Sequence, residues 1–168
     1  ASADLARMAK KAGDISAERI VPGDALKMLE QDHREVEAFF EQYEKLEDES
    51  EKLKLAAKIC VALTVHTRLE EELIYPLGRK EIEETDLIDE AEVEHASAKQ
   101  LIADTARMSP GDDLFDAKVK VLGEYVKHHV KEEENELFPT MKKEADVDFY
   151  DVGKKMAARK TAMLTDLR

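Results

Sequence analysis

Two short stretches of this chain place histidine, glutamate, an aromatic residue and proline at the same relative positions. Residues 66–76 read HTRLEEELIYP, and residues 128–139 read HHVKEEENELFP. In each stretch a glutamate follows a histidine by one helical turn, as Glu70 follows His66 and Glu133 follows His129. Residues at this spacing lie on one face of a helix, about 6 Å apart along its axis. An imidazole beside a carboxylate is a donor combination that binds metal ions.

Two further histidines belong to the same pattern. His33 precedes the first of these stretches at nearly the same separation as His95 precedes the second. The chain therefore reads as two helical hairpins built on one repeated pattern. Each hairpin supplies one histidine from its first helix and an HxxxE pair from its second.

Four of the five histidines fall on apolar stripes that should face a common core. Buried imidazoles without partners would each lose hydrogen bonds at a cost of roughly 1–3 kcal/mol. Two buried carboxylates facing each other would not both stay ionised unless a cation lay between them. Two metal ions about 3.5–4 Å apart, bridged by both carboxylates and capped by the histidines, would satisfy all of these groups. The mixed nitrogen and oxygen donors favour iron, with manganese or zinc as alternatives.

Helices must position these donors. Apolar residues recur at three- and four-residue spacing over about 24–45, from just after Ser50, over about 86–107 and after SPGDD at 109–113. Short connections predict an all-α, antiparallel, up-down-up-down four-helix bundle over residues 24–143. Residues 1–23 and 144–168 are expected to be accessory segments, with amphipathic helices around Leu5 to Ala12 and from Val147 to Leu167, which pack on the bundle or on a second subunit in a homodimer. Pro76 and Pro139 should end or kink their helices.

These motifs resemble the hemerythrin-like family of HHE cation-binding domains. The resemblance rests on QDH at 31–33, HTRLEEELIYP at 66–76, VEH at 93–95 and HHVKEEENELFP at 128–139. It implies a four-helix bundle with a non-heme di-iron centre that reacts with oxygen, and Glu70 and Glu133 would bridge the two ions. The implied ligands are His33, His66, Glu70, His95, His129 and Glu133.

The chain departs from the oxygen-carrying hemerythrins in two places. Those carriers have a further histidine one turn after the third-helix histidine, where this chain has Lys99. Their last carboxylate is an aspartate at the fifth position after the last histidine, whereas the best candidate here is Glu133, at the fourth position. Fewer protein ligands leave more open coordination positions. These departures argue against reversible oxygen carriage as the function and favour reaction with peroxide, oxygen or nitric oxide. A sensing or storage protein without turnover is the alternative, so whether the chain is an enzyme stays open.

A ferritin-like di-iron oxidase is a structural rival, because that class uses ExxH motifs. EQDH at 30–33 and EVEH at 92–95 fit the motif but would leave His66 and His129 without a role, so Glu30 and Glu92 are expected to orient ligand imidazoles instead. Lys99 is expected to reach solvent and His128 to lie off the core. Tyr75 and Phe138 are expected to cap the bundle end, while Tyr125 is a candidate to approach a bound ligand.

Composition limits the partners. The net charge of −13 would repel nucleic acid, and no apolar run is long enough to span a membrane. The single cysteine, Cys60, falls on a predicted helix, which suggests a buried thiol and a reducing, cytoplasmic location. A small ligand such as oxygen, peroxide or nitric oxide is the expected partner.

Overall fold

The computed structural model describes residues 2–13 and 20–167, and within these ranges the regular structure is helical throughout. The all-α prediction is therefore confirmed. The elements in chain order are α1 (Ser2–Ala12), α2 (Ala25–Glu44), α3 (Glu49–Leu69), η1 (Glu70–Ile74), α4 (Tyr75–Glu81), α5 (Asp86–Ala106), α6 (Phe115–Glu132), η2 (Glu133–Leu137), α7 (Phe138–Glu144) and α8 (Phe149–Asp166).

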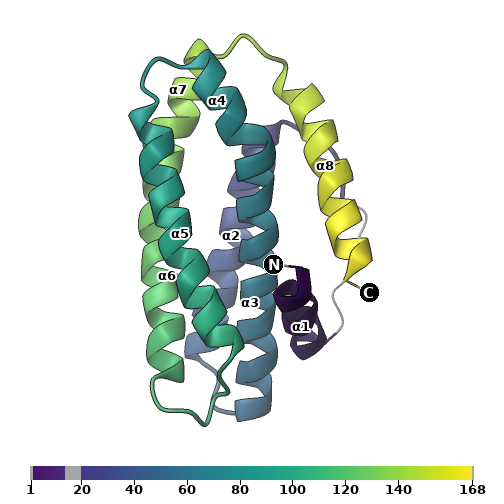
Figure 1. The fold of residues 1–168 in the computed structure, drawn as a ribbon, viewed down its shortest axis with the longest axis vertical. Helices are drawn as coiled ribbons and strands as arrows, with labels where there is room; N and C mark the ends of the chain where they lie inside the picture. Colours follow the sequence, from purple (N-terminus) through teal and green to yellow (C-terminus); the bar gives the residue numbers. More distant parts are fainter. Residues whose placement is uncertain (1, 14–19, 168) are drawn as a thin grey trace.

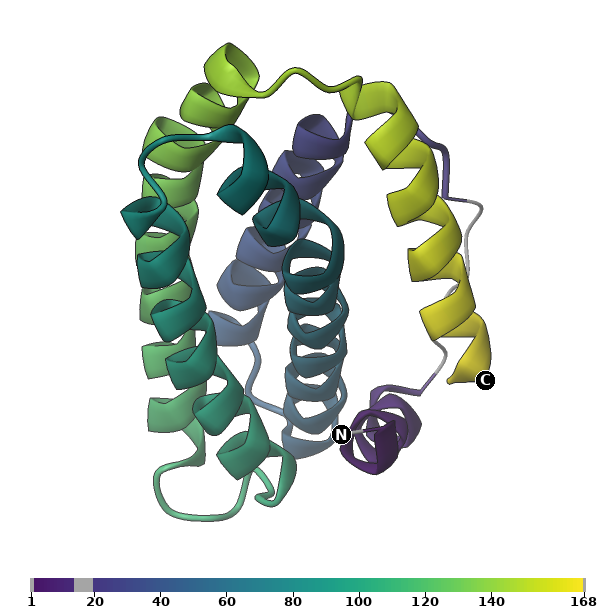
Figure 2. The ribbon, with the colours of Figure 1, turned by 45° about the horizontal axis from the view of Figure 1, so that its top comes forward.

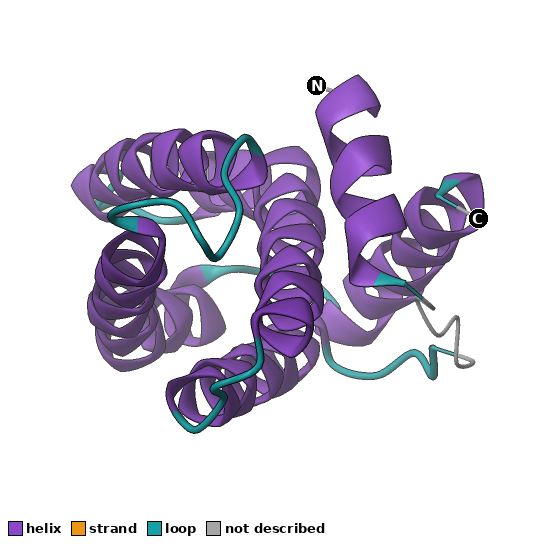
Figure 3. Ribbon diagram, turned by 90° about the horizontal axis from the view of Figure 1, so that it is seen from below, coloured by secondary structure: helices purple, strands orange, loops and turns teal. Residues whose placement is uncertain are grey.

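Helices α2, α3, α5 and α6 form the antiparallel bundle, and each runs opposite to the one before it (Figure 1). Seen from below, the helices pack side by side, and short loops join them at the end nearest the viewer (Figure 3). Their apolar stripes meet in one core that includes Leu29, Ile59, Ile88 and Leu122, all almost fully buried.

Aspartates set the starts of several helices. The side chain of Asp24 accepts hydrogen bonds from the backbone N–H groups of Leu26 and Lys27 at 2.9 and 3.1 Å, as an N-cap does. Asp48 caps α3 in the same way through Glu51 N at 2.9 Å. This cap explains why the second bundle helix starts at Glu49, slightly earlier than the sequence pattern predicted.

The prolines do not end the bundle helices. A π-helical turn, η1 or η2, follows each HxxxE histidine, and the chain then continues as α4 or α7 with Pro76 or Pro139 in the first turn. A proline interrupts an α-helix because it lacks an N–H and its ring meets the carbonyl of the preceding turn. The wider π-turn accommodates both effects. It begins at Glu70 in one hairpin and at Glu133 in the other, and single π-turns are frequent at functional sites.

The two predicted terminal helices, α1 and α8, are present and lie beside the bundle (Figure 2), while residues 14–19 fall outside the described part of the chain. Helix α1 packs on α3 and α5, while α8 packs on α2 and α3. The close contact of α8 depends on Gly153, where an added Cβ would lie 1.7 Å from the carbonyl oxygen of Gly23. Domain boundaries at 23/24 and 143/144 and the predicted homodimer stay predictions.

Among the described residues, no helix is both long and apolar enough to cross a bilayer.

Candidate metal centre

The six predicted ligands converge in the middle of the bundle. The four helices each contribute one histidine, and the two glutamates stand at the first positions of the π-turns. Glu70 and Glu133 are almost completely buried, as are His33, His66 and His95. Their donor atoms fall into two overlapping groups, within each of which the atoms lie no more than 4.8 Å apart.

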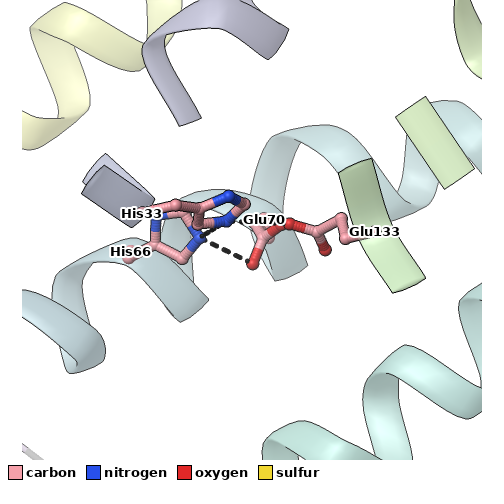
Figure 4. Close-up of side chains that lie close together, drawn as sticks. All are labelled: His33, His66, Glu70 and Glu133. Atoms are coloured by element: carbon pink, nitrogen blue, oxygen red, sulfur yellow. Dashed lines mark hydrogen bonds and ion pairs between the residues drawn. The ribbon is translucent and has the colours of Figure 1, made fainter. Parts of the chain in front are cut away.

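The first group joins His33 and His66 to both glutamates, and Figure 4 shows the two imidazoles facing the carboxylates. The Nε2 atoms of His33 and His66 are 3.2 Å apart. Nε2 of His66 is 3.1 Å from Oε1 of Glu70, and Nε2 of His33 is 3.2 Å from Oε1 of Glu133.

The second group is the counterpart in the other half of the repeat. The Nε2 atoms of His95 and His129 are 3.3 Å apart. Nε2 of His95 is 3.2 Å from Oε1 of Glu70, and Nε2 of His129 is 3.1 Å from Oε2 of Glu133. Each glutamate thus contacts one histidine of each pair, which is the arrangement that two carboxylates bridging two cations require.

Several polar atoms of this cluster have no hydrogen-bond partner among the described residues although they are buried. They are both carboxylate oxygens of Glu70, Oε1 of Glu133 and Nδ1 of His95. Leaving such groups unpaired costs about 1–3 kcal/mol each, and more for charged groups. Cations between the histidine pairs would satisfy the carboxylates, so the residues present fit a two-metal centre.

Outer carboxylates orient three of the histidines through Nδ1. His66 donates to Asp32 at 3.1 Å, His129 to Glu94 at 2.9 Å and His33 to Glu134 at 2.6 Å. With Nδ1 protonated, Nε2 of each ring keeps its lone pair for a metal. His95 differs, because its Nδ1 is 3.9 Å from Glu71.

The repeat contains these outer groups too, although none of them was predicted from the sequence to contact a histidine. Asp32 and Glu94 each precede the histidine of a first helix, and Glu71 and Glu134 each follow a bridging glutamate. The predicted groups Glu30 and Glu92 are instead near Lys142 and Arg79, with N–O distances of 3.8 and 3.0 Å. The expectation that they orient the imidazoles was therefore wrong. The ferritin-like interpretation is not supported either, because it needs these two carboxylates at the centre.

In the metal-free protein, protonated imidazoles balance the negative charges of the buried glutamates. Burial opposes a charged imidazole, but Glu70 and the hydrogen bond to Asp32 outweigh it and raise the pKa of His66 to about 10. Burial also opposes a charged His129, but hydrogen bonds to Glu133, Glu70 and Glu94 raise its pKa to about 12. Burial would raise the pKa of Glu70, yet the positive charge of His66, whose Nε2 lies 3.1 Å from Oε1 of Glu70, holds that pKa well below its usual value.

Tyr75 is a site residue, although its place in the sequence predicted only an apolar cap at the end of the bundle. Its hydroxyl donates to Oε2 of Glu133 at 2.9 Å and lies 3.0 Å from Nε2 of His95. Burial and the nearby glutamates raise the pKa of Tyr75 well above 10, so the phenol keeps its proton. The equivalent residue in the other hairpin is Phe138, which stacks on His33 with ring centroids 6.1 Å apart. The centre is therefore asymmetric, and the Tyr/Phe difference between the repeats was the sequence signal for it.

The remaining candidates lie around the centre. Lys99 is half exposed and binds Glu71, with Nζ 2.5 Å from Oε1. Tyr125 is exposed at the rim of a narrow cavity of about 30 Å³ that all four histidines line. His128 lies on the surface, as expected from its position directly before His129. Cys60 is a buried free thiol, as predicted.

Two comparisons with known proteins bear on the family and the fold. The family model for the hemerythrin HHE cation binding domain matches residues 24–141. A solved structure of a hemerythrin HHE cation binding domain-containing protein from Mycobacterium kansasii superposes with a TM-score of 0.73 at 21% identity, over 88% of this chain and 90% of that one.

A curated relative, a DNA nickase from Nostoc sp. (strain PCC 7120), is 29% identical over 115 residues. The match covers 68% of this chain but 32% of that protein, so this chain spans about a third of the relative's length.

Proposed function

Because this chain belongs to the hemerythrin HHE cation-binding family, we propose that it holds two iron ions between its histidine pairs and binds or reacts with oxygen or peroxide there. The coarser conclusion, a hemerythrin-like metal-binding protein, follows from the family match and the buried donor groups. The choice of iron rests on the mixed nitrogen and oxygen donors.

One observation supports this function above the others. Glu70 and Glu133 each contact a histidine from both pairs, and three of their four carboxylate oxygens have no hydrogen-bond partner among the described residues. His33, His66, His95 and His129 would complete the two positions. When bound, a pair of iron ions supplies one-electron redox changes and Lewis acidity toward a small oxygen ligand.

The protein's own groups would prepare the centre for such a ligand. Asp32, Glu94 and Glu134 fix the imidazole tautomers, and the apolar walls of the narrow cavity, such as Val36 and Val126, limit the access of water. The Tyr75 hydroxyl keeps its proton and lies beside both Glu133 and His95, so it could turn from Glu133 to donate to a ligand on the His95 side of the centre. Lys99 stands where the oxygen carriers have a further histidine, and it binds Glu71 rather than completing the donor set.

The test combines metal analysis with a peroxide assay. Gently purified or iron-reconstituted protein should contain two iron ions per chain and absorb in the near ultraviolet and visible. Peroxide should change the spectrum and be consumed faster than by the same concentration of free iron. Two bound ions without faster consumption would favour a binding or sensing protein without turnover, whereas absence of bound metal would refute the proposal.

A further inference from the structure

The two halves of the repeat present different outer surfaces. Along the second helix of the first hairpin and the π-turn that follows it, Val65, Leu69 and Leu73 are apolar. The equivalent positions of the second hairpin are His128, Glu132 and Glu136. Helix α8 packs against the first hairpin, on the side of α2 and α3 away from α5 and α6 (Figures 1 and 2). The second hairpin therefore exposes polar donors where the first buries an apolar surface.

Three of the polar residues on this exposed side lie within reach of one ion, and we name them the outer cluster: Glu94, His128 and Glu132. Nε2 of His128 is 3.1 Å from Oε1 of Glu132 and 3.4 Å from Oε2 of Glu94. One donor atom from each residue lies within 4.8 Å of the others. His128 is 63% exposed, whereas Glu94 is largely covered, so the cluster extends from solvent toward the protein interior.

The outer cluster leads to the metal centre. A narrow cavity of about 10 Å³ has Glu94 and Glu132 among its lining residues, and it also reaches His129 and Glu133 of the centre. Glu94 joins the two sites directly, because one of its oxygens accepts from Nδ1 of His129 while the other faces His128.

The charges around the four carboxylates beside the histidine Nδ1 atoms, Asp32, Glu71, Glu94 and Glu134, also favour a cation near Glu94. Lysine or arginine side chains contact three of the four: Lys160 contacts Asp32, Arg34 contacts Glu134, and Lys99 contacts Glu71.

The ion pairs of the fourth outer carboxylate, Glu94, are with His128 and His129. Glu90 and Glu136 line the same cavity and add negative charge at its mouth. A concentrated negative field of this kind draws cations to a cleft.

We propose that Glu94, His128 and Glu132 bind a divalent transition-metal ion at the surface and deliver it to the two-metal centre. The inference rests on the proposed function, since it requires a centre to fill. One imidazole and two carboxylates suit Fe²⁺, Mn²⁺ or Zn²⁺, and solvent can complete the coordination. Glu94 is the residue that links the two sites, because one of its carboxylate oxygens faces His128 of the outer cluster and the other accepts from His129 of the centre.

The test follows Co²⁺ binding to metal-free protein, because the visible bands of Co²⁺ report its ligands. Wild type should bind two Co²⁺ tightly and a third more weakly. The variant H128Q/E132Q should lose the third ion and fill the two inner positions at least about tenfold more slowly, since focused fields raise association rates by about 10-fold or more. Its final inner occupancy should still be two, because the six inner donors are unchanged.

The matched control is Glu124→Gln, which removes one negative charge from an exposed position on the same helix, α6. It should bind three Co²⁺ at nearly the wild-type rate. Equal filling rates in wild type and H128Q/E132Q, with two inner ions in both, would overturn this inference alone. Failure of wild type to bind two Co²⁺ would instead refute the two-metal centre and, with it, delivery to that centre.

Discussion

Replacing Tyr75 by phenylalanine should destabilise the metal-free protein, although the ring stays in place. The side chain is 1% exposed, and its hydroxyl donates at 2.9 Å to Glu133, which is itself buried. Phe138 occupies the equivalent position in the other hairpin, so a phenylalanine ring suits this environment. The substitution therefore creates little cavity, and its main effect is to remove a donor from a buried carboxylate.

A hydrogen bond to a charged group contributes about 1.5–3 kcal/mol. We expect Tyr75→Phe to lower the unfolding free energy of the metal-free protein by about that amount. For a chain of this length, such a loss lowers Tm by roughly 3–12 °C. Urea denaturation of chelator-treated protein, followed by circular dichroism, measures it directly.

Tyr43→Phe is the matched control for this experiment. Tyr43 is also buried and its hydroxyl donates to a carboxylate, Asp116, at 2.7 Å. The side chain of Asp116 is 62% exposed, so water can replace the lost donor. The cost should stay below about 1 kcal/mol. Equal losses in the two variants, or no loss in Tyr75→Phe, would show that Glu133 does not depend on the phenol.

Three further outcomes follow from the same geometry. Removing metal with a chelator should lower Tm, because each ion at about 100 times its Kd stabilises the folded state by about 2.7 kcal/mol; identical melting of both forms would contradict this. The double substitution His66→Ala with His129→Ala should abolish metal binding in elemental analysis, whereas His128→Ala should retain two ions. The raised pKa of His66, about 10, stabilises the metal-free fold fully below pH 6.5 and progressively less as pH rises through 10. Urea titrations should therefore show falling stability of the metal-free protein over that range, and a smaller slope for the metal-loaded protein, in which the imidazole cannot bind a proton.

The sequence by itself determined the helical bundle and the six converging donors. Apolar residues at three- and four-residue spacing define which face of each helix turns inward, and the HxxxE spacing puts Glu70 beside His66 on such a face. The recurrence of this pattern at His129 and Glu133 predicted a second, equivalent half. Local periodicity is enough for these conclusions because side-chain direction along a helix depends on position alone.

Only the tertiary structure decided which groups surround those donors. Asp32 contacts His66 and Glu94 contacts His129 across helix pairs, so these partners depend on how far one helix is rotated and shifted against its neighbour. Tyr75 reaches Glu133 because the π-turn before it redirects the chain into α4, and a π-turn has no signature in the apolar spacing. The exposed outer cluster likewise depends on where α8 packs. These are contacts between residues far apart in the sequence, and their distances are fixed by packing rather than by helical periodicity.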